Sequence, residues 1–450
     1  MAIGTSPTRA TLSVLDAVAI IVGIVVGAGL FETPQMVAAN AGSKTMLVLV
    51  WVAGGALSLL GALCYAELAT AYPDTGGMYF YIKRAFGQAP AFLLAWSRLL
   101  VIQTGSIALL GFVLGDYASQ VFNLGRHSPA IYAATAVIVL TFANVRGVRL
   151  GRWMQNSLSL AKVAAVVAVT VTGFMLPAAP SGPAVMQTTA PQSSIGLMMI
   201  FVLLTYGGWQ EAGYIAAEVK DTRRSMVKAL LYSIGIITVI FVAVNAALVH
   251  GLGLTGMANS RAVVADVLRL GMGPSGAIVV SIAVMVAALG SMQGTIFTGA
   301  RTNFALGRDF RMFRGLAQWN ESGQTPTRAL LVQGGIALLL VLLGTTTRHG
   351  FKTMVEYTAP VFWLFVFLTG LALIILRIKE PEIERPFRVP LYPLTPILFS
   401  ATSAYLLYAS LAYTGIGALF GVLVLGAGLA VLYVERRKQR TSTSESRRAA

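Results

Sequence analysis

The chain has 450 residues, of which 56% are hydrophobic and 11% are charged, and its mean hydropathy is +0.75. Soluble domains carry about a quarter charged residues, so this composition excludes a soluble globular protein and indicates one that crosses a membrane repeatedly. The net charge of +16 does not indicate a nucleic-acid partner, because most of the 33 Lys and Arg cluster between hydrophobic segments, as the positive-inside rule describes.

Hydrophobic segments long enough to cross about 30 Å of hydrocarbon recur along the chain. We predict twelve, in an inner or plasma membrane, and the distribution of basic residues then puts both termini in the cytoplasm. The predicted spans are residues 14–42, 46–71, 86–118, 130–146, 152–176, 194–219, 227–252, 264–298, 328–345, 354–377, 392–412 and 414–434.

These spans predict an all-α polytopic membrane protein with a single transmembrane domain, residues 14–434. A cytoplasmic N-terminal tail, residues 1–13, precedes it, and a basic cytoplasmic tail, residues 435–450, follows it and either touches anionic headgroups or is disordered. Within the domain we expect one repeat over about 14–176, a second over about 194–377, and accessory helices over about 392–434.

Glycine-rich stretches interrupt the first and sixth spans, at Gly27-Ala28-Gly29 and at Gly207-Gly208. Lipid offers no hydrogen-bond partners, so non-helical backbone at this depth is stable only where protein or a polar cavity covers it. The two halves start on opposite sides of the membrane, which is typical of inverted-repeat transporters with a midplane substrate site. The alternative is that these glycines only permit close helix packing.

The groups that such breaks release suit a zwitterion. Amides at the positive end of a half-helix favour a carboxylate, and carbonyls at a negative end favour an ammonium group. Glycine at these positions lets backbone and ligand approach closely. We therefore expect the backbone of a substrate to bind at Val25, Gly27, Ala28, Gly29, Leu30, Leu204 and Gly207.

Side chains near the second break and in the third span are candidates for a side-chain pocket or gate. Glu211, directly after the break, either contacts the substrate or is a structural acid where the helix restarts. Arg98 is expected to pair with a cytoplasmic carboxylate. Helix packing explains the polar residues of the third span equally well. The candidates are Leu204, Tyr206, Trp209, Gln210, Glu211, Gln103 and Thr104.

Lys162 lies ten residues into the fifth predicted span. A cation at this depth is costly unless it is paired or hydrated, so it indicates a functional site. The alternative is a lysine whose ammonium reaches the inner surface.

Four motifs in chain order resemble those of the amino acid–polyamine–organocation transporters, and most closely their L-type amino acid transporter branch. Residues 21–34 resemble the first-helix motif, and residues 66–79 the loop after the second helix. Residues 206–221 are similar to the sixth helix, and residues 299–326 to the loop after the eighth. The resemblance implies a five-plus-five inverted repeat with discontinuous helices 1 and 6 and two accessory helices.

The resemblance also implies a role for Lys162. In sodium-independent members the fifth-helix lysine stands in place of a bound sodium ion, so its ammonium is expected to bridge carbonyls near Gly23 to Ser291. One departure concerns gating. Many relatives carry a bulky aromatic residue at the position of Leu204. Leucine there either leaves room for other substrate side chains, or the gate moves to Tyr206 or Trp209.

We therefore expect a sodium-independent secondary transporter of L-amino acids, neutral ones first, working as an exchanger or coupled to protons. A transporter of cationic amino acids or polyamines, with Glu211 pairing to the distal amine, is the alternative. A transporter-like amino acid sensor is the alternative from another class. No enzymatic, cofactor or metal motif stands out, and an accessory subunit or homo-oligomer is left open.

Overall fold

The computed structural model describes residues 10–27, 29–179, 195–260, 262–273, 275–345, 350–414 and 418–448. Among them, ten helices are long and apolar enough to cross a membrane, and a shorter apolar helix lies near the N-terminus. The same residues contain no strand, only isolated bridges joining Leu12 to Val219 and Asn320 to Thr325. The prediction of an all-helical polytopic membrane protein is confirmed.

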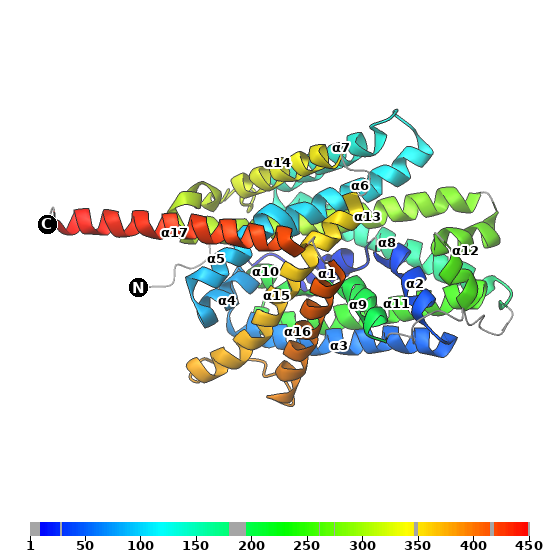
Figure 1. The fold of residues 1–450 in the computed structure, drawn as a ribbon, viewed down its shortest axis with the longest axis horizontal. Helices are drawn as coiled ribbons and strands as arrows, with labels where there is room; N and C mark the ends of the chain where they lie inside the picture. The colour runs from blue at the N-terminus through cyan, green and yellow to red at the C-terminus, as the bar shows by residue number, and fades with distance from the viewer. Residues whose placement is uncertain are drawn as a thin grey trace.

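Figure 1 labels most of the helices along the bundle. In chain order the α-helices are α1 (Val14–Val25), α2 (Gly29–Asn40), α3 (Lys44–Ala71), α4 (Met78–Phe86), α5 (Gln88–Ser97), α6 (Gln103–Val121), α7 (Ser128–Arg146), α8 (Val148–Met175), α9 (Ile195–Tyr206), α10 (Ala212–Ile215), α11 (Thr222–Asn259), α12 (Val263–Met272), α13 (Ser275–Asp309), α14 (Thr327–Gly344), α15 (Gly350–Lys379), α16 (Leu394–Thr414) and α17 (Ala418–Arg448). A π-helical turn, η1 (Arg98–Ile102), joins α5 to α6, and three 3-10 segments are η2 (Trp209–Glu211), η3 (Ala216–Glu218) and η4 (Arg311–Ala317).

The local sequence explains where α1 begins. The hydroxyl of Ser13 accepts from the amide of Asp16 at 3.1 Å, and the Asp16 carboxylate accepts from the Ser13 amide at 2.9 Å. This capping box satisfies amides that a helix start leaves without partners. The apolar run from Val14 then forms α1.

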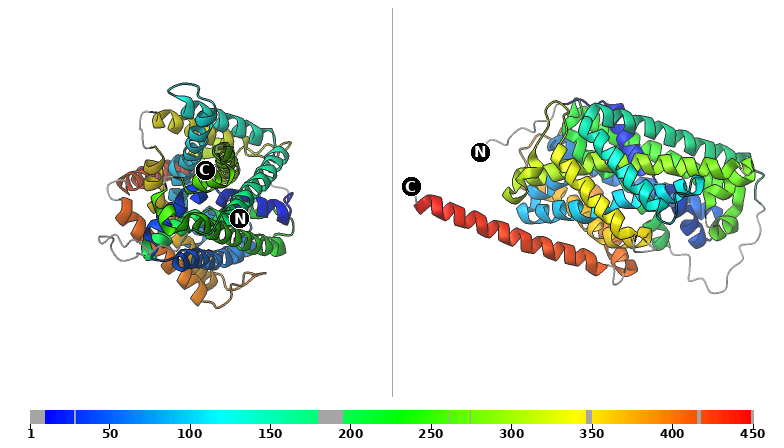
Figure 2. Two further views of the ribbon diagram at one scale, coloured as in Figure 1. Left: turned by 90° about the vertical axis from the view of Figure 1, so that its right-hand side faces the viewer. Right: turned by 90° about the horizontal axis from the view of Figure 1, so that it is seen from above.

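Several predicted spans have different boundaries. The predicted span 86–118 is two helices joined by the π-turn, and the predicted span 264–298 is the separate helix α12 followed by α13, which continues to Asp309. The C-terminal segment also differs. α17 continues to Arg448, so the predicted tail from residue 435 is helical up to that point, and it projects beyond the bundle in Figure 2. The apolar pattern does not predict where α13 and α17 end, because both helices continue beyond their apolar segments.

Small residues let the helices that carry the site approach one another. A Cβ at Gly294 of α13 would lie 2.3 Å from Cγ1 of Ile24, and a Cβ at Gly23 of α1 would lie 2.2 Å from the hydroxyl of Ser159 on α8. Interfaces of this kind are typical of helix packing in lipid. They hold α1 between α8 and α13.

Candidate substrate site at two helix breaks

The first break lies between α1 and α2. α1 ends at Val25, and the amide of Gly27 turns back to donate to the Val25 carbonyl at 2.8 Å. Ala28 lies outside the described residues. The amide of Leu30, one of the residues expected to bind the substrate backbone, already donates to the Gly27 carbonyl at 3.2 Å. Gly29 is the first residue of α2, a position whose amide has no partner within the helix.

The second break lies between α9 and α10. α9 ends at Tyr206, and Gly208 has φ of +121°, a conformation that L side chains rarely adopt. Its amide donates to the side-chain oxygen of Gln210 at 2.9 Å. The chain then forms one 3-10 turn before the helix resumes at Ala212. Gln210 thus satisfies an amide that the break would otherwise leave without a partner.

The two breaks touch each other. A Cβ at Gly208 would lie 2.8 Å from Cγ2 of Ile24, in the last turn of α1. Past the first break, the hydroxyl of Thr205 donates to the hydroxyl of Thr33 at 2.8 Å. Segments far apart in sequence therefore present their non-helical backbone to one region.

The carbonyls predicted to receive an ammonium group each take part in a tight turn. The Val25 carbonyl accepts from the Gly27 amide at 2.8 Å, and the Leu204 carbonyl accepts from the Gly207 amide at 3.2 Å. A carbonyl oxygen has two lone pairs, so each retains capacity for a second donor.

Lys162 lies behind the first break. Its side chain is only 1% exposed, on α8, and its ammonium donates to the Gly23 carbonyl and, at 2.9 Å, to the hydroxyl of Ser291 on α13. The Ser291 hydroxyl also lies 3.1 Å from the carbonyl of Ile24. The predicted contacts are present, and the ammonium does not reach the inner surface. It satisfies the Gly23 carbonyl, which the end of α1 leaves without a helical partner.

Comparison with known proteins agrees with this geometry. A family profile described as amino acid permease matches residues 12–437. The chain belongs to the amino acid permease family.

Individual relatives are similar along most of their length. The chain is 30% identical over 413 residues to the b(0,+)-type amino acid transporter 1 of Mus musculus, a match that covers 90% of this chain and 83% of that protein. It is 26% identical over 434 residues to the serine/threonine exchanger SteT of Bacillus subtilis (strain 168), covering 95% and 97%. It is also 26% identical over 434 residues to the Asc-type amino acid transporter 1 of Mus musculus, covering 94% and 80%. The permease is therefore a multi-pass membrane transporter of the L-type branch and not an enzyme.

An ion pair inside the permease connects the third span to the second break. The Arg98 guanidinium binds both carboxylate oxygens of Glu211, at 3.0 and 2.9 Å, with the side chains 2% and 7% exposed. The Arg98 guanidinium also lies 4.2 Å from the ring centre of Tyr214. The expectation that Arg98 pairs with a cytoplasmic carboxylate is therefore wrong.

The Arg98–Glu211 pair joins residues that are 113 positions apart, so no local pattern announces it. The available signal was that two opposite charges lie within predicted spans, where each needs a partner. Bidentate pairing occupies the Glu211 carboxylate and fixes the 3-10 turn in which this residue lies.

The other candidate pocket side chains pack within the permease, with one exception. Gln103 donates to the Thr295 carbonyl at 2.9 Å, and Thr104 donates to Leu99 at 3.0 Å. Tyr206 is fully buried and donates to the Trp51 carbonyl at 2.9 Å. Leu204 is 40% exposed. Leu204 is thus partly exposed in this conformation, whereas Tyr206 is held against α3.

Trp209 and Gln210 line a small cavity beside the second break. The cavity has a volume of about 30 Å³ and also touches Gly207 and residues of α3, α15 and α16. It is too small for an amino acid. The indole ring of Trp209 stands edge-on to the ring of Tyr65, with centroids 5.1 Å apart. Aromatic packing therefore holds Trp209 against α3 at the edge of this cavity.

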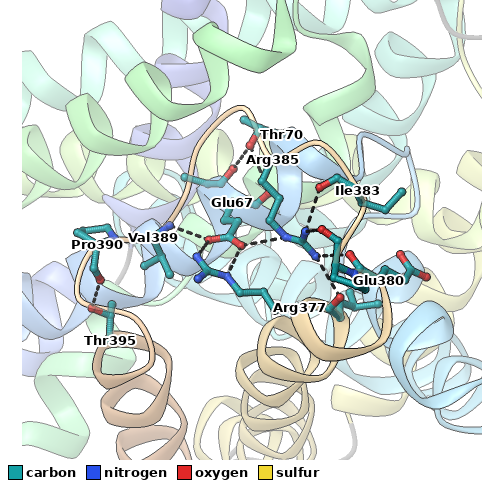
Figure 3. A network of polar contacts seen from close by, with 12 residues as sticks. Glu67, Thr70, Arg377, Glu380, Ile383, Arg385, Val389, Pro390 and Thr395 are labelled. Carbon is teal, nitrogen blue, oxygen red and sulfur yellow. Dashed lines mark hydrogen bonds and ion pairs between the residues drawn. The ribbon is translucent and has the colours of Figure 1, made fainter.

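Ion pairs tie together one end of the permease (Figure 3). Glu67 on α3 binds Arg377 at 2.5 and 2.7 Å, lies 3.4 Å from Arg385, and accepts from the Val389 amide at 2.7 Å. The Arg385 guanidinium also donates to carbonyls near the end of α15, at 3.0 and 2.8 Å. These contacts fix α15 and the loop after it to α3.

Further contacts at the same end involve the segment after the second break. Arg301 of α13 binds Glu218 at 2.7 Å, and both side chains are buried. The backbone of Glu218 accepts from the amides of Thr11 and Leu12 at 2.9 Å each. Residues preceding α1 are thereby held against the segment after α10.

Proposed function

We propose that this permease is a sodium-independent exchanger of neutral L-amino acids in the cell membrane, with both termini in the cytoplasm. The observation that carries the proposal is the contact between two helix breaks, with the Lys162 ammonium bound between α1 and α13. The basic loops favour this orientation.

The substrate backbone would bind where the breaks meet. Its carboxylate suits the amide of Gly29 at the start of α2, and its ammonium suits the second lone pairs of the Val25 and Leu204 carbonyls. These are backbone groups, so they would accept any α-amino acid. Leu204, the exposed side chain at the second break, is then positioned to contact the substrate's own side chain.

Pairing between Arg98 and Glu211 favours neutral over cationic substrates. Glu211 is the acid nearest the second break in sequence, and both its oxygens already accept from a guanidinium. A distal amine would have to displace Arg98 and leave it buried without a partner, which is costly. The relatives include a serine/threonine exchanger, which supports small neutral substrates and exchange.

Lys162 supports transport that does not depend on sodium. Its ammonium donates to the carbonyl of Gly23 and the hydroxyl of Ser291, oxygen atoms of the kind that also bind hard cations. Its positive charge would hold α1 against α13 there without a dissociable ion.

The test is uptake of labelled amino acids into proteoliposomes that contain the purified permease. Uptake of serine or leucine should require unlabelled amino acid inside, proceed equally in sodium and potassium buffers, and exceed uptake of arginine. Strict sodium dependence would contradict the role proposed for Lys162. Accumulation in empty vesicles driven only by a proton gradient would replace exchange with proton-linked transport.

A further inference from the structure

A basic pocket opens at the end of the molecule where α7 meets α8. Its volume is about 920 Å³, and none of its lining residues in the described chain is acidic. Four cationic side chains line it: Arg146, Arg149, Arg152 and Lys220. Its rim is fixed by the Val148 amide, which donates to the Gly323 carbonyl at 2.8 Å. A stable rim around unbalanced positive charge favours an anionic ligand.

The start of α8 strengthens this charge. Helices generally favour acidic residues in their first turn, because the amides there carry partial positive charge. α8 instead has no acidic residue in its first turn, which contains Arg149, and Arg152 follows directly after that turn. Arg152 reaches Asp16 at 3.5 Å and the Thr11 carbonyl at 3.1 Å. Arg152 therefore shares its charge with Asp16, whereas Arg146, Arg149 and Lys220 form no ion pair with the described residues, so the pocket keeps a net positive charge.

An apolar groove continues from the pocket along the bundle. The groove has a volume of about 270 Å³ between α7, α8 and α13, and Trp153 lines both spaces. Its other lining residues are Ala136, Val139, Leu140, Met154, Ser157, Leu158 and Leu289. The Trp153 side chain is 66% exposed, and tryptophans of this kind mark the level of lipid headgroups. The basic pocket and the apolar groove thus meet at the depth of the lipid headgroups.

We propose that this joined pocket and groove bind one anionic phospholipid, with its phosphate among the four cations and an acyl chain in the groove. Basic pockets between transmembrane helices on the cytoplasmic side favour anionic headgroups. The N-terminal residues 1–9 are a poorer occupant, because they contain Arg9 and no acidic residue. Placing the lipid in the inner leaflet rests on the orientation proposed above.

Such a lipid would act on the first half-helix. Arg152 lines the pocket and also contacts Thr11 and Asp16, which lie beside the start of α1. A phosphate bound at Arg152 would hold this guanidinium in place. The lipid would thereby stabilise the arrangement in which residues 11–12 contact Glu218.

The experiment measures thermal unfolding of the full-length protein in detergent while dioctanoyl phosphatidylglycerol is added. The unfolding temperature should rise saturably, and much less with dioctanoyl phosphatidylcholine. The Arg146→Gln/Arg149→Gln protein should bind phosphatidylglycerol roughly thirtyfold more weakly, from about 1 kcal/mol per basic residue. Arg224→Gln/Lys228→Gln is the matched control, since it removes two exposed cations outside the pocket, and it should keep wild-type affinity.

The groove is tested with Val139→Trp, which fills it from an exposed position and should reduce the response to phosphatidylglycerol. An unchanged response would overturn the proposal. So would an equal response of the two double variants, or stabilisation by inorganic phosphate alone, which identifies a soluble anion site. A response that appears only after deletion of residues 2–9 would show this segment to be the occupant. Binding in detergent does not depend on transport or orientation, so failure here leaves the proposed function untouched.

Discussion

The buried ammonium of Lys162 joins helices from both halves of the sequence. It binds Gly23 on α1 and Ser291 on α13 from its position on α8. Ser291 in turn contacts the Ile24 carbonyl. The carbonyls at the end of α1 thus depend on two side chains from other helices, and the first break is stable only while both are present.

We predict that Lys162→Ala reduces amino acid exchange in proteoliposomes by roughly tenfold or more, because a lost hydrogen bond to a charged group is worth about 1.5–3 kcal/mol. Ser291→Ala, which keeps the ammonium, should have a smaller effect. Exchange by Lys162→Ala at the wild-type rate would show that the ammonium is dispensable.

The Arg98–Glu211 pair supports a prediction about stability. Glu211→Gln leaves a buried guanidinium uncompensated and should lower the free energy of unfolding by about 3–5 kcal/mol. The double variant Arg98→Met/Glu211→Leu should recover most of this loss, because apolar residues of similar volume often replace a buried pair at little cost.

Thermal unfolding of Arg98→Met, Glu211→Leu and the double variant, in one detergent, measures the coupling energy of this pair. Additive losses would mean that the two side chains act independently and would contradict the bidentate contact. If the double variant also transports arginine, the discrimination against cationic substrates resides in this pair.

At the scale of elements, the second break depends on a glycine conformation and on close approach to α1. Gly208 has φ of +121°, and its position leaves no room for a Cβ beside Ile24. Backbone of this kind is unfavourable for any other residue by about 1–3 kcal/mol. The geometry of the second break therefore depends on Gly208 itself and on its contact with Ile24 of α1.

We predict that Gly208→Ala abolishes exchange and lowers the unfolding temperature, whereas Gly335→Ala leaves exchange unchanged. Gly335 lies within α14 with no atom near the position of a Cβ. Alanine there should stabilise the helix by about 0.5–1 kcal/mol. Uptake and thermal unfolding distinguish the two outcomes, and equal effects of the two substitutions would argue against a special role for the break.

At the scale of the whole molecule, ion pairs connect distant segments at one end of the helix bundle. Glu67 binds Arg377 and Arg385, while Arg301 binds Glu218. Exchange by alternating access would require this end to open, and we therefore predict that these contacts break during transport.

We predict that Glu67→Gln raises the rate at which a maleimide labels Cys64, the single cysteine of the chain. Cys64 is buried in α3, one turn before Glu67. If opening limits labelling, each 1.4 kcal/mol lost from the closed state raises the rate about tenfold. Glu384→Gln is the control, because the ion pair between Glu384 and Arg223 is exposed and should leave the rate unchanged. Cys64→Ser reports background, and no difference between the two Gln variants would refute the role of Glu67.

Local sequence determined that the chain crosses a membrane many times, where both breaks lie and that Lys162 lies deep in a helix. It did not determine the number of spans, because we predicted twelve, and ten helices in the described residues are long and apolar enough to cross a membrane. Apolar length predicts spans because a helix must cross about 30 Å of hydrocarbon. Glycines predict breaks only where polar, aromatic or acidic residues lie beside them, since the pairs Gly54-Gly55 and Gly334-Gly335 lie within continuous helices. The contact of Lys162 with Gly23 and Ser291 was also predicted, through resemblance to a family, since no local pattern relates three helices.

Only the tertiary structure decided how the charges inside the bundle are matched. Nothing near Arg98 indicates Glu211, and nothing near Glu67 indicates Arg377. The sequence requires each buried charge to have a partner, because an unpaired one is costly in low dielectric. Which partner it takes depends on how the helices pack. In this bundle the packing brings Arg98 to Glu211, so the Glu211 carboxylate is already paired.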